Sequence, residues 1–111
     1  YDNKNKMTSI FTKIINREIP SEIVYEQENL IVIKDINPKA KTHLLIIPKK
    51  EIESVNDLSI EDTALISDLI LKSKEIAEKL WISQGYQLHI NVWKLWWQEV
   101  PHLHIHLLSD I

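Results

Sequence analysis

Three histidines stand at every second position of an apolar run near the end of the chain: His102, His104 and His106 within PHLHIHLL. Alternate side chains of a β-strand point to opposite faces, so a strand over 101–108 places all three imidazoles on one face. Neutral imidazole is a nucleophile, and imidazolium is a proton donor near neutral pH. The spacing therefore predicts a row of imidazoles that divides attack and proton transfer at an anionic centre.

A zinc site is the alternative chemistry for these histidines. Residues two apart on a strand have side chains roughly 6.6 Å apart, whereas zinc needs each nitrogen within about 2.0–2.1 Å. One strand supplies two ligands, so a third has to come from His43, His89 or a carboxylate. Because no spacing fixes that third ligand, we expect no metal site and no required cofactor.

The elements that position the histidines follow from periodicity. Helical spacing predicts a short helix over 9–17 and the main helix over 60–80, with Ser59 as its N-cap and Asp62 at position N3. Strands are predicted over 23–26, 30–34, 43–48 and 86–92, before the histidine strand. The order indicates an α+β fold, a five-stranded antiparallel sheet with one main helix and a short N-terminal helix.

The faces of the last two strands are mutually consistent. Over 86–92, the polar residues Gln87, His89 and Asn91 alternate with apolar residues that suit the helix-facing side. If this strand pairs with the histidine strand, Asn91 lies on the histidine face. We therefore expect an active-site face on one side of the sheet and the main helix on the other.

Composition limits the classes of protein. The chain has 111 residues, a formal net charge of −3 and 44% hydrophobic residues, which fit one domain. No run approaches the ~20 apolar residues of a membrane span, and no basic stripe favours duplex nucleic acid. Cysteine is absent, which favours a cytoplasmic location. We expect residues 1–8 to be a disordered or foreign N-terminal extension and residues 9–111 to form the domain.

The run HLHIHLL resembles the histidine-triad motif, His-x-His-x-His with apolar x, of the histidine triad (HIT) nucleotide-binding superfamily. The resemblance covers residues 9–108. SIFTKIINREIPSEIVYEQENLIVIKDINPKAKTHLLIIPKK, GYQLHINV and QEVPHLHIHLL look like the two halves of its Hint branch. The resemblance implies a HIT-like fold and a purine nucleoside phosphoramidase-like activity. Nucleoside phosphoramidates would be hydrolysed through a covalent nucleotidyl-histidine intermediate.

The same resemblance implies a role for each residue. His104 would attack the α-phosphorus, His106 would contact the phosphate and leaving group, and His102 would orient the nucleophile. His43 would support this network, and Asp35 would bind the ribose hydroxyls. The other residues implied to contact the nucleotide are an apolar base pocket of Ile10, Phe11, Ile14, Ile19, Ile33 and Ile36, with polar Asn91, Gln98 and Glu99. Glu99 stands where some relatives carry a small hydroxyl residue.

The implied partners are a purine nucleotide, an AMP or GMP derivative, and a second copy of the chain. The homodimer would pair the main helix and the strand over 86–92, with His89 near the two-fold axis. Two other functions stay open: a dinucleoside polyphosphate hydrolase, which IPKK after the third strand disfavours, and a nucleotide-binding protein with little turnover.

Four tryptophans depart from the pattern of these relatives, which carry glycine at positions 81, 93, 96 and 97. The chain has four tryptophans and one glycine, against about eight glycines at ordinary usage. Loop glycines supply positive φ and close approach of N–H groups to phosphate, and tryptophan supplies neither. We hypothesise that UGA codons read as glycine in the source were translated as tryptophan. Made with tryptophan, the chain is expected to keep its sheet and to show weakened or absent catalysis, with Trp96 and Trp97 filling the phosphate site.

Overall fold

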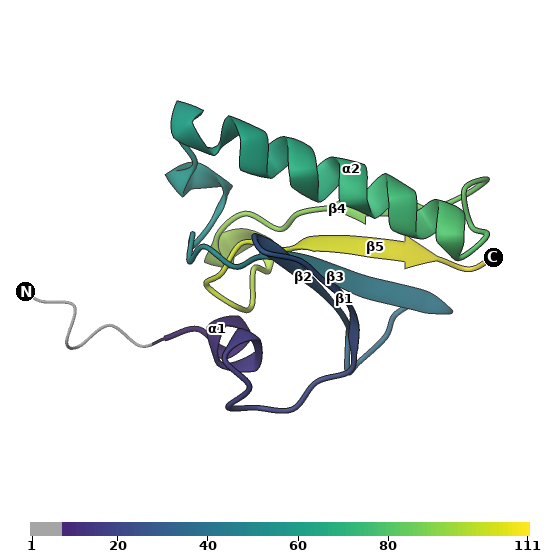
Figure 1. Ribbon diagram of the computed structural model, residues 1–111, viewed down its shortest axis with the longest axis horizontal. Coiled ribbons are helices and arrows are strands. Elements are labelled where there is room, and N and C mark those ends of the chain that lie inside the picture. Colours follow the sequence, from purple (N-terminus) through teal and green to yellow (C-terminus); the bar gives the residue numbers. More distant parts are fainter. Residues whose placement is uncertain (1–7) are drawn as a thin grey trace, which may run out of the picture.

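The computed structural model describes residues 8–111, so the extension predicted for residues 1–8 lies, apart from Thr8, outside the described part. The described chain forms a five-stranded antiparallel sheet with one long and one short α-helix, which confirms the predicted α+β class. Helix α2 (Thr63–Lys79) covers one face of the sheet, and α1 (Ile10–Ile15) lies beside the opposite face (Figure 1). The two faces of the sheet are therefore covered by different helices.

The sheet has the order β1-β2-β3-β5-β4, and all neighbouring strands are antiparallel. Its strands are β1 (Ile23–Glu26), β2 (Leu30–Lys34), β3 (Thr42–Pro48), β4 (Gln87–His89) and β5 (Ile105–Ser109). The central strand β3 packs Leu44 and Ile46 toward the α2 core and Leu45 and Ile47 toward the α1 core. Burial on both faces explains its uninterrupted apolar sequence.

The predicted cap is present, but it starts a 3-10 turn, and the main helix begins at Thr63 and not at Ile60. A 3-10 turn (Ile60–Asp62) leads into α2, and Ser59 and Asp62 form a capping box at its start. The predicted apolar stripe is too wide, however, because Ile70 and Leu80 are more than two-fifths exposed. Of the helices in residues 8–111, none is long and apolar enough to cross a membrane.

The structure corrects two strand predictions. The strand expected over 86–92 shortens to β4, and the histidine strand begins only at Ile105, after His102 and His104. The backbone explains the late start, because Leu103 donates its N–H to the carbonyl of Ile52, outside the β3–β5 ladder, at 2.7 Å. The side chains still alternate, because Leu103, Ile105 and Leu107 all pack in the α2 core and the three histidines lie on the opposite face.

Candidate active site

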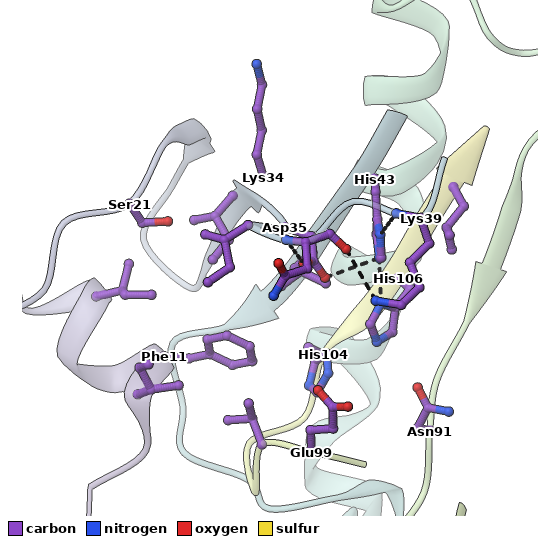
Figure 2. A pocket seen from close by; sticks show the side chains of 18 of the residues that line it. Phe11, Ser21, Lys34, Asp35, Lys39, His43, Asn91, Glu99, His104 and His106 are labelled. Atoms are coloured by element: carbon purple, nitrogen blue, oxygen red, sulfur yellow. Dashed lines mark hydrogen bonds and ion pairs between the residues drawn. The ribbon is translucent and has the colours of Figure 1, made fainter. Parts of the chain in front are cut away.

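A cavity of about 450 Å³ opens on the sheet face that carries α1. One end is apolar, and the six residues predicted to form a base pocket all line it: Ile10, Phe11, Ile14, Ile19, Ile33 and Ile36. The other end is lined by Asp35, His43, His104 and His106 (Figure 2). The cavity thus joins an apolar slot, which the resemblance implies, to a group of imidazoles, which the spacing predicts.

Hydrogen bonds fix the proton positions of two of these histidines. The backbone N–H of Lys39 donates to Nδ1 of His43 at 3.1 Å, so a neutral His43 carries its proton on Nε2. That Nε2 lies 2.9 Å from Nδ1 of His106 and 3.4 Å from Oδ2 of Asp35 (Figure 2). His43 therefore donates to His106, and a neutral His106 keeps its own proton on Nε2.

The tautomer of His104 is set by the backbone. Its Nδ1 lies 2.7 Å from the carbonyl oxygen of His102, and a carbonyl oxygen only accepts, so Nδ1 carries the proton. The lone pair of the neutral ring is therefore on Nε2. Because His104 lines the cavity, this nitrogen is the cavity's available nucleophile.

His102 lies beneath the cavity and does not line it. Its side chain is fully buried, with 0% exposure, and Nε2 donates to the carbonyl oxygen of Pro48 at 2.9 Å. Nδ1 lies 2.6 Å from Oγ of Ser9, at the N-terminus of α1. The common face predicted for the three imidazoles is confirmed, because the ring of Phe11 in α1 contacts both His102 and His104, and His104 contacts His106. On that face His104 and His106 line the cavity, whereas His102 is buried.

All five histidines of the chain belong to one group, called here the histidine cluster: His43, His89, His102, His104 and His106. The ring of His106 lies 4.5 Å from His89, stacked upon it, 4.9 Å from His104 and 5.2 Å from His43. The resemblance implies that His89 lies near the dimer axis. In the structure His89 lines the cavity. Its alternation with Asn91 along one strand was the signal for that position.

Burial favours the uncharged form of His43, His102, His104 and His106. Loss of hydration lowers the pKa of His43, His102 and His104 below the ordinary value for histidine. For His106, burial and then repulsion from the neighbouring imidazoles lower the pKa to about 4. Neutral rings are what the hydrogen-bonded tautomers require, so the nucleophilic lone pair of His104 is present at neutral pH.

Among residues 8–111, Asp35, His43 and His106 are the one group placed to hold a metal ion, with ligand atoms all within 4.8 Å of one another. A metal would need the lone pair of His43 at Nε2. The N–H of Lys39 occupies Nδ1 and holds the proton on Nε2, so the observed hydrogen bonds oppose metal binding. That the protein needs no metal stays a prediction.

The loop before the histidines holds the remaining predicted polar residues. Asn91 and Glu99 line the cavity, and Asn91 donates to the carbonyl of Trp96 at 3.1 Å. Gln98 is not among the residues that line it, and its place near the phosphate stays a prediction. Its side chain is buried and accepts from the N–H of Trp93 at 2.8 Å, and its amide donates to the Val100 carbonyl at 3.0 Å. The buried side chain of Gln98 therefore holds the backbone of the loop through hydrogen bonds.

The tryptophans occupy unusual backbone conformations. Trp81, Trp93 and Trp97 have φ of 61°, 69° and 65°, and Arg17 is the other non-glycine residue with positive φ in the described chain. Trp97 lines the cavity, whereas Trp96 does not, and filling of the phosphate site by the indoles stays a prediction. We call residues 93–97 the tryptophan loop.

Comparison with known proteins identifies the class. Residues 8–111 match the family described as scavenger mRNA decapping enzyme C-term binding. A HIT family hydrolase from Legionella pneumophila Philadelphia 1 has the same fold, with a TM-score of 0.91, 41% identity and coverage of 94% of both chains. The chain belongs to the histidine triad (HIT) family.

Two curated relatives match most of the chain. The purine nucleoside phosphoramidase of Escherichia coli (strain K12) is 46% identical over 102 residues, which cover 91% of this chain and 86% of that protein. An uncharacterized HIT-like protein of Synechocystis sp. is 46% identical over 101 residues, which cover 91% of this chain and 89% of that protein.

Proposed function

We propose that the protein is a hydrolase of purine nucleoside phosphoramidates that uses His104 as its nucleophile. The observation that carries this proposal is the tautomer of His104: its Nδ1 proton is bound to the His102 carbonyl at 2.7 Å, which leaves Nε2 free to attack. The name of the Escherichia coli relative supports the choice of substrate.

The cavity suits a nucleoside monophosphate in one orientation. The apolar end provides a slot for a flat base between Phe11, Ile14 and Ile33. Asp35 lies between this end and the histidines, where a carboxylate can accept hydrogen bonds from the two ribose hydroxyls. The phosphate then falls beside His104 and His106.

The proposed reaction has two steps. First, Nε2 of His104 bonds to the α-phosphorus while the bond from phosphorus to the amine nitrogen breaks. Then water attacks the same phosphorus and releases one proton to solvent, the bond to Nε2 breaks, and the nucleotide leaves with His104 neutral again. Covalent catalysis of this kind replaces one difficult displacement with two easier ones.

The departing amine needs a proton, which we assign to His106. Its pKa of about 4 is too low for an acid in the empty cavity at neutral pH. A bound phosphate adds negative charge and raises that pKa, since an opposite charge favours the charged form of a histidine. Substrate binding therefore favours a second proton on His106, at Nδ1, with the N–H of His43 turning to Asp35, which lies 3.4 Å away. The protonated ring gives its Nε2 proton to the amine and becomes neutral again.

Turnover of adenosine 5′-phosphoramidate tests the proposal. AMP release is followed for the chain as it stands and for a glycine form, in which glycine replaces Trp81, Trp93, Trp96 and Trp97. The glycine form should hydrolyse the substrate, His104→Ala in it should not, and EDTA should have no effect. Binding without turnover in both forms contradicts the enzymatic proposal. Turnover that survives His104→Ala contradicts the mechanism, and loss with EDTA would favour a metal site.

One observation favours a nucleotide-binding protein with little turnover as a second candidate. Trp97 is 69% exposed and lines the cavity, so its indole competes for space beside the histidines. The comparison of the two forms decides between the candidates, because a binding protein shows no turnover in either. The same assay, with a dinucleoside polyphosphate as the substrate, tests the remaining alternative activity.

We also propose a homodimer. β4 is an edge strand of the sheet, and exposed apolar side chains lie on α2 and just after β4: Ile70, Leu71 and Ile90. An uncovered sheet edge beside apolar surface favours pairing with a second copy. Light scattering should give the mass of two chains, and Leu71→Glu should reduce it to one.

A further inference from the structure

Ser9 connects the first helix to the histidine cluster. Its hydroxyl oxygen accepts the N–H of Thr12 at 3.0 Å as the N-cap of α1, and it also lies 2.6 Å from Nδ1 of His102. Ser9 is 93 residues from His102 in the chain and only 6% exposed. The contact is therefore long-range and shielded from water.

The direction of this hydrogen bond follows from its neighbours. His102 donates from Nε2 to the Pro48 carbonyl, so its Nδ1 must accept. Thr12 lies 3.4 Å from the same Nδ1, but its hydroxyl donates to Glu51 at 2.8 Å. Ser9 is the hydroxyl left to donate to Nδ1 of His102. The serine thus accepts from its helix and donates to the histidine at the same time.

His102 in turn holds the ring of His104, the proposed nucleophile, in place. Its carbonyl oxygen holds Nδ1–H of His104 at 2.7 Å. The ring of Phe11, on the same helix as the Ser9 cap, packs edge-on against both imidazoles, with centroids 5.8 Å from His102 and 5.1 Å from His104. One short helix therefore contacts both rings by packing and one of them by a hydrogen bond.

The same helix lines the apolar end of the cavity through Ile10, Phe11 and Ile14. We propose that Ser9 is a positioning residue for His104, acting through His102, and that α1 couples occupation of the apolar slot to the orientation of the nucleophile. The inference rests on the proposed role of His104. It adds a residue that does not line the cavity and a link between recognition of the nucleoside and attack on phosphorus.

The kinetic test compares three variants in the glycine form. Ser9→Ala removes the donor, Ser9→Thr retains it, and Ser59→Ala removes a matched serine cap at the start of the 3-10 turn before α2, away from the cavity. We expect Ser9→Ala to lower kcat about tenfold or more with KM unchanged, because small displacements of a nucleophile slow attack strongly. Ser9→Thr should restore kcat. A loss in Ser9→Ala no larger than that in Ser59→Ala would overturn the proposal.

A measurement without turnover separates this proposal from the proposed function. Adenosine, which lacks a phosphate, is titrated into the full chain labelled with 15N at histidine. The Nδ1 resonance of His102 should move on binding in the unsubstituted protein and in Ser59→Ala, and much less in Ser9→Ala. Adenosine that binds without moving this resonance would overturn the coupling, whatever the enzyme hydrolyses.

A different observation, the backbone at the tryptophans, carries a second inference. Trp93 has φ 69° and ψ 168°, a region that essentially only glycine occupies. Trp97 has φ 65° and ψ 30°, in the left-handed region. The chain's single glycine, Gly85, is not among the residues with positive φ. Glycine-type conformations are thus held by tryptophan, while glycine occupies an ordinary one.

The end of α2 shows the same pattern. Leu80 is the C-cap, and Trp81 follows with φ 61°. Trp81 donates to the carbonyl of Glu78 at 3.2 Å, and Ile82 donates to the carbonyl of Ala77 at 3.0 Å. These two bonds form the Schellman motif, in which the residue at the position of Trp81 is usually glycine.

We infer that the functional protein carries glycine at positions 81, 93 and 97. A codon shared by the four tryptophans extends this to Trp96, whose own backbone does not require glycine. The codons in the source gene and the mass of the protein purified from its natural host test the inference. UGA codons and a mass lower by the difference between tryptophan and glycine at these positions are expected. UGG codons, or a mass that fits tryptophan, would overturn it.

Discussion

The histidine cluster and the tryptophan loop lie next to each other in the chain and around the same cavity, but they are built on different principles. Four rings of the cluster have their tautomer fixed by a hydrogen-bond partner, such as the N–H of Lys39 for His43 and the carbonyl of His102 for His104. The loop instead depends on backbone conformations at Trp93 and Trp97 that a tryptophan holds at a cost. The chemistry is therefore carried by side chains in one region and by the backbone in the other.

The largest expected effect lies in the histidine cluster. His104→Ala in the glycine form should lower kcat for adenosine 5′-phosphoramidate by about a thousandfold or more, since it removes the nucleophile itself. AMP should still bind, because the apolar slot and Asp35 are untouched. Steady-state kinetics and calorimetry of AMP binding check the two parts. Equal loss of binding and turnover would mean that the substitution disrupts the cavity and not the reaction.

Asp35 should affect binding more than chemistry. Asp35→Asn is expected to raise KM about tenfold or more with little change in kcat, because hydrogen bonds to a charged acceptor contribute about 1.5–3 kcal/mol. The 2′,3′-dideoxy substrate, which lacks the ribose hydroxyls, should show the same KM in both proteins. If Asp35→Asn still raises KM with this substrate, Asp35 acts through His43, which lies 3.4 Å from it, and not through the ribose.

Acid should destabilise the fold through the cluster. The pKa of His106 is lowered to about 4 in the folded state, below its value in the unfolded chain, so the unfolded chain binds more protons between these values. Stability is then fully present above the unfolded pKa and falls as the pH is lowered toward 4. Between about pH 7 and about pH 5 this histidine alone should remove about 2 kcal/mol.

Urea unfolding at the two pH values measures the acid effect. His106→Asn should be less stable at neutral pH and should lose less stability on acidification. The tryptophan loop contains no histidine and no carboxylate, so glycine at its positions should leave the pH dependence unchanged. Equal pH dependence in His106→Asn and the parent would contradict the assignment.

The smallest expected effect lies in the loop and has the opposite sign. Trp93→Gly should stabilise the protein by about 1 kcal/mol or more, since it relieves a conformation that costs about 1–3 kcal/mol for other residues. Trp96→Gly is the matched control, with the same change of side chain in the same loop at an ordinary φ. It should be neutral or destabilising, because glycine there only adds freedom to the unfolded chain. If both variants shift the melting temperature equally, backbone strain at Trp93 is not the cause.

The structural features that depend on local periodicity could be predicted from the sequence. The α+β sheet, the capping box of Ser59 and Asp62 and the apolar lining residues of the cavity all follow from spacing or from the resemblance it supports. Alternation also predicted the common face of the three histidines, but not the start of the strand, because the chain bonds to Ile52 before β5 begins.

Contacts between segments that are distant in the chain could not be predicted from local sequence patterns. No local pattern links Ser9 to His102, since the two meet only when α1 packs beneath the cavity. The resemblance to the HIT family implies a place near the phosphate for Gln98. The structure uses its amide to bind the backbone of Trp93 and Val100 inside the loop.

The central claim, that Nε2 of His104 attacks phosphorus, is tested most directly by trapping the intermediate. The glycine form is mixed with adenosine 5′-phosphoramidate, quenched within the first turnover and analysed by intact-mass and peptide mass spectrometry. The account predicts a mass increase of one adenylyl group that maps to His104 and is absent from His104→Ala. Hydrolysis that proceeds with no adduct, or an adduct on another histidine, would contradict it.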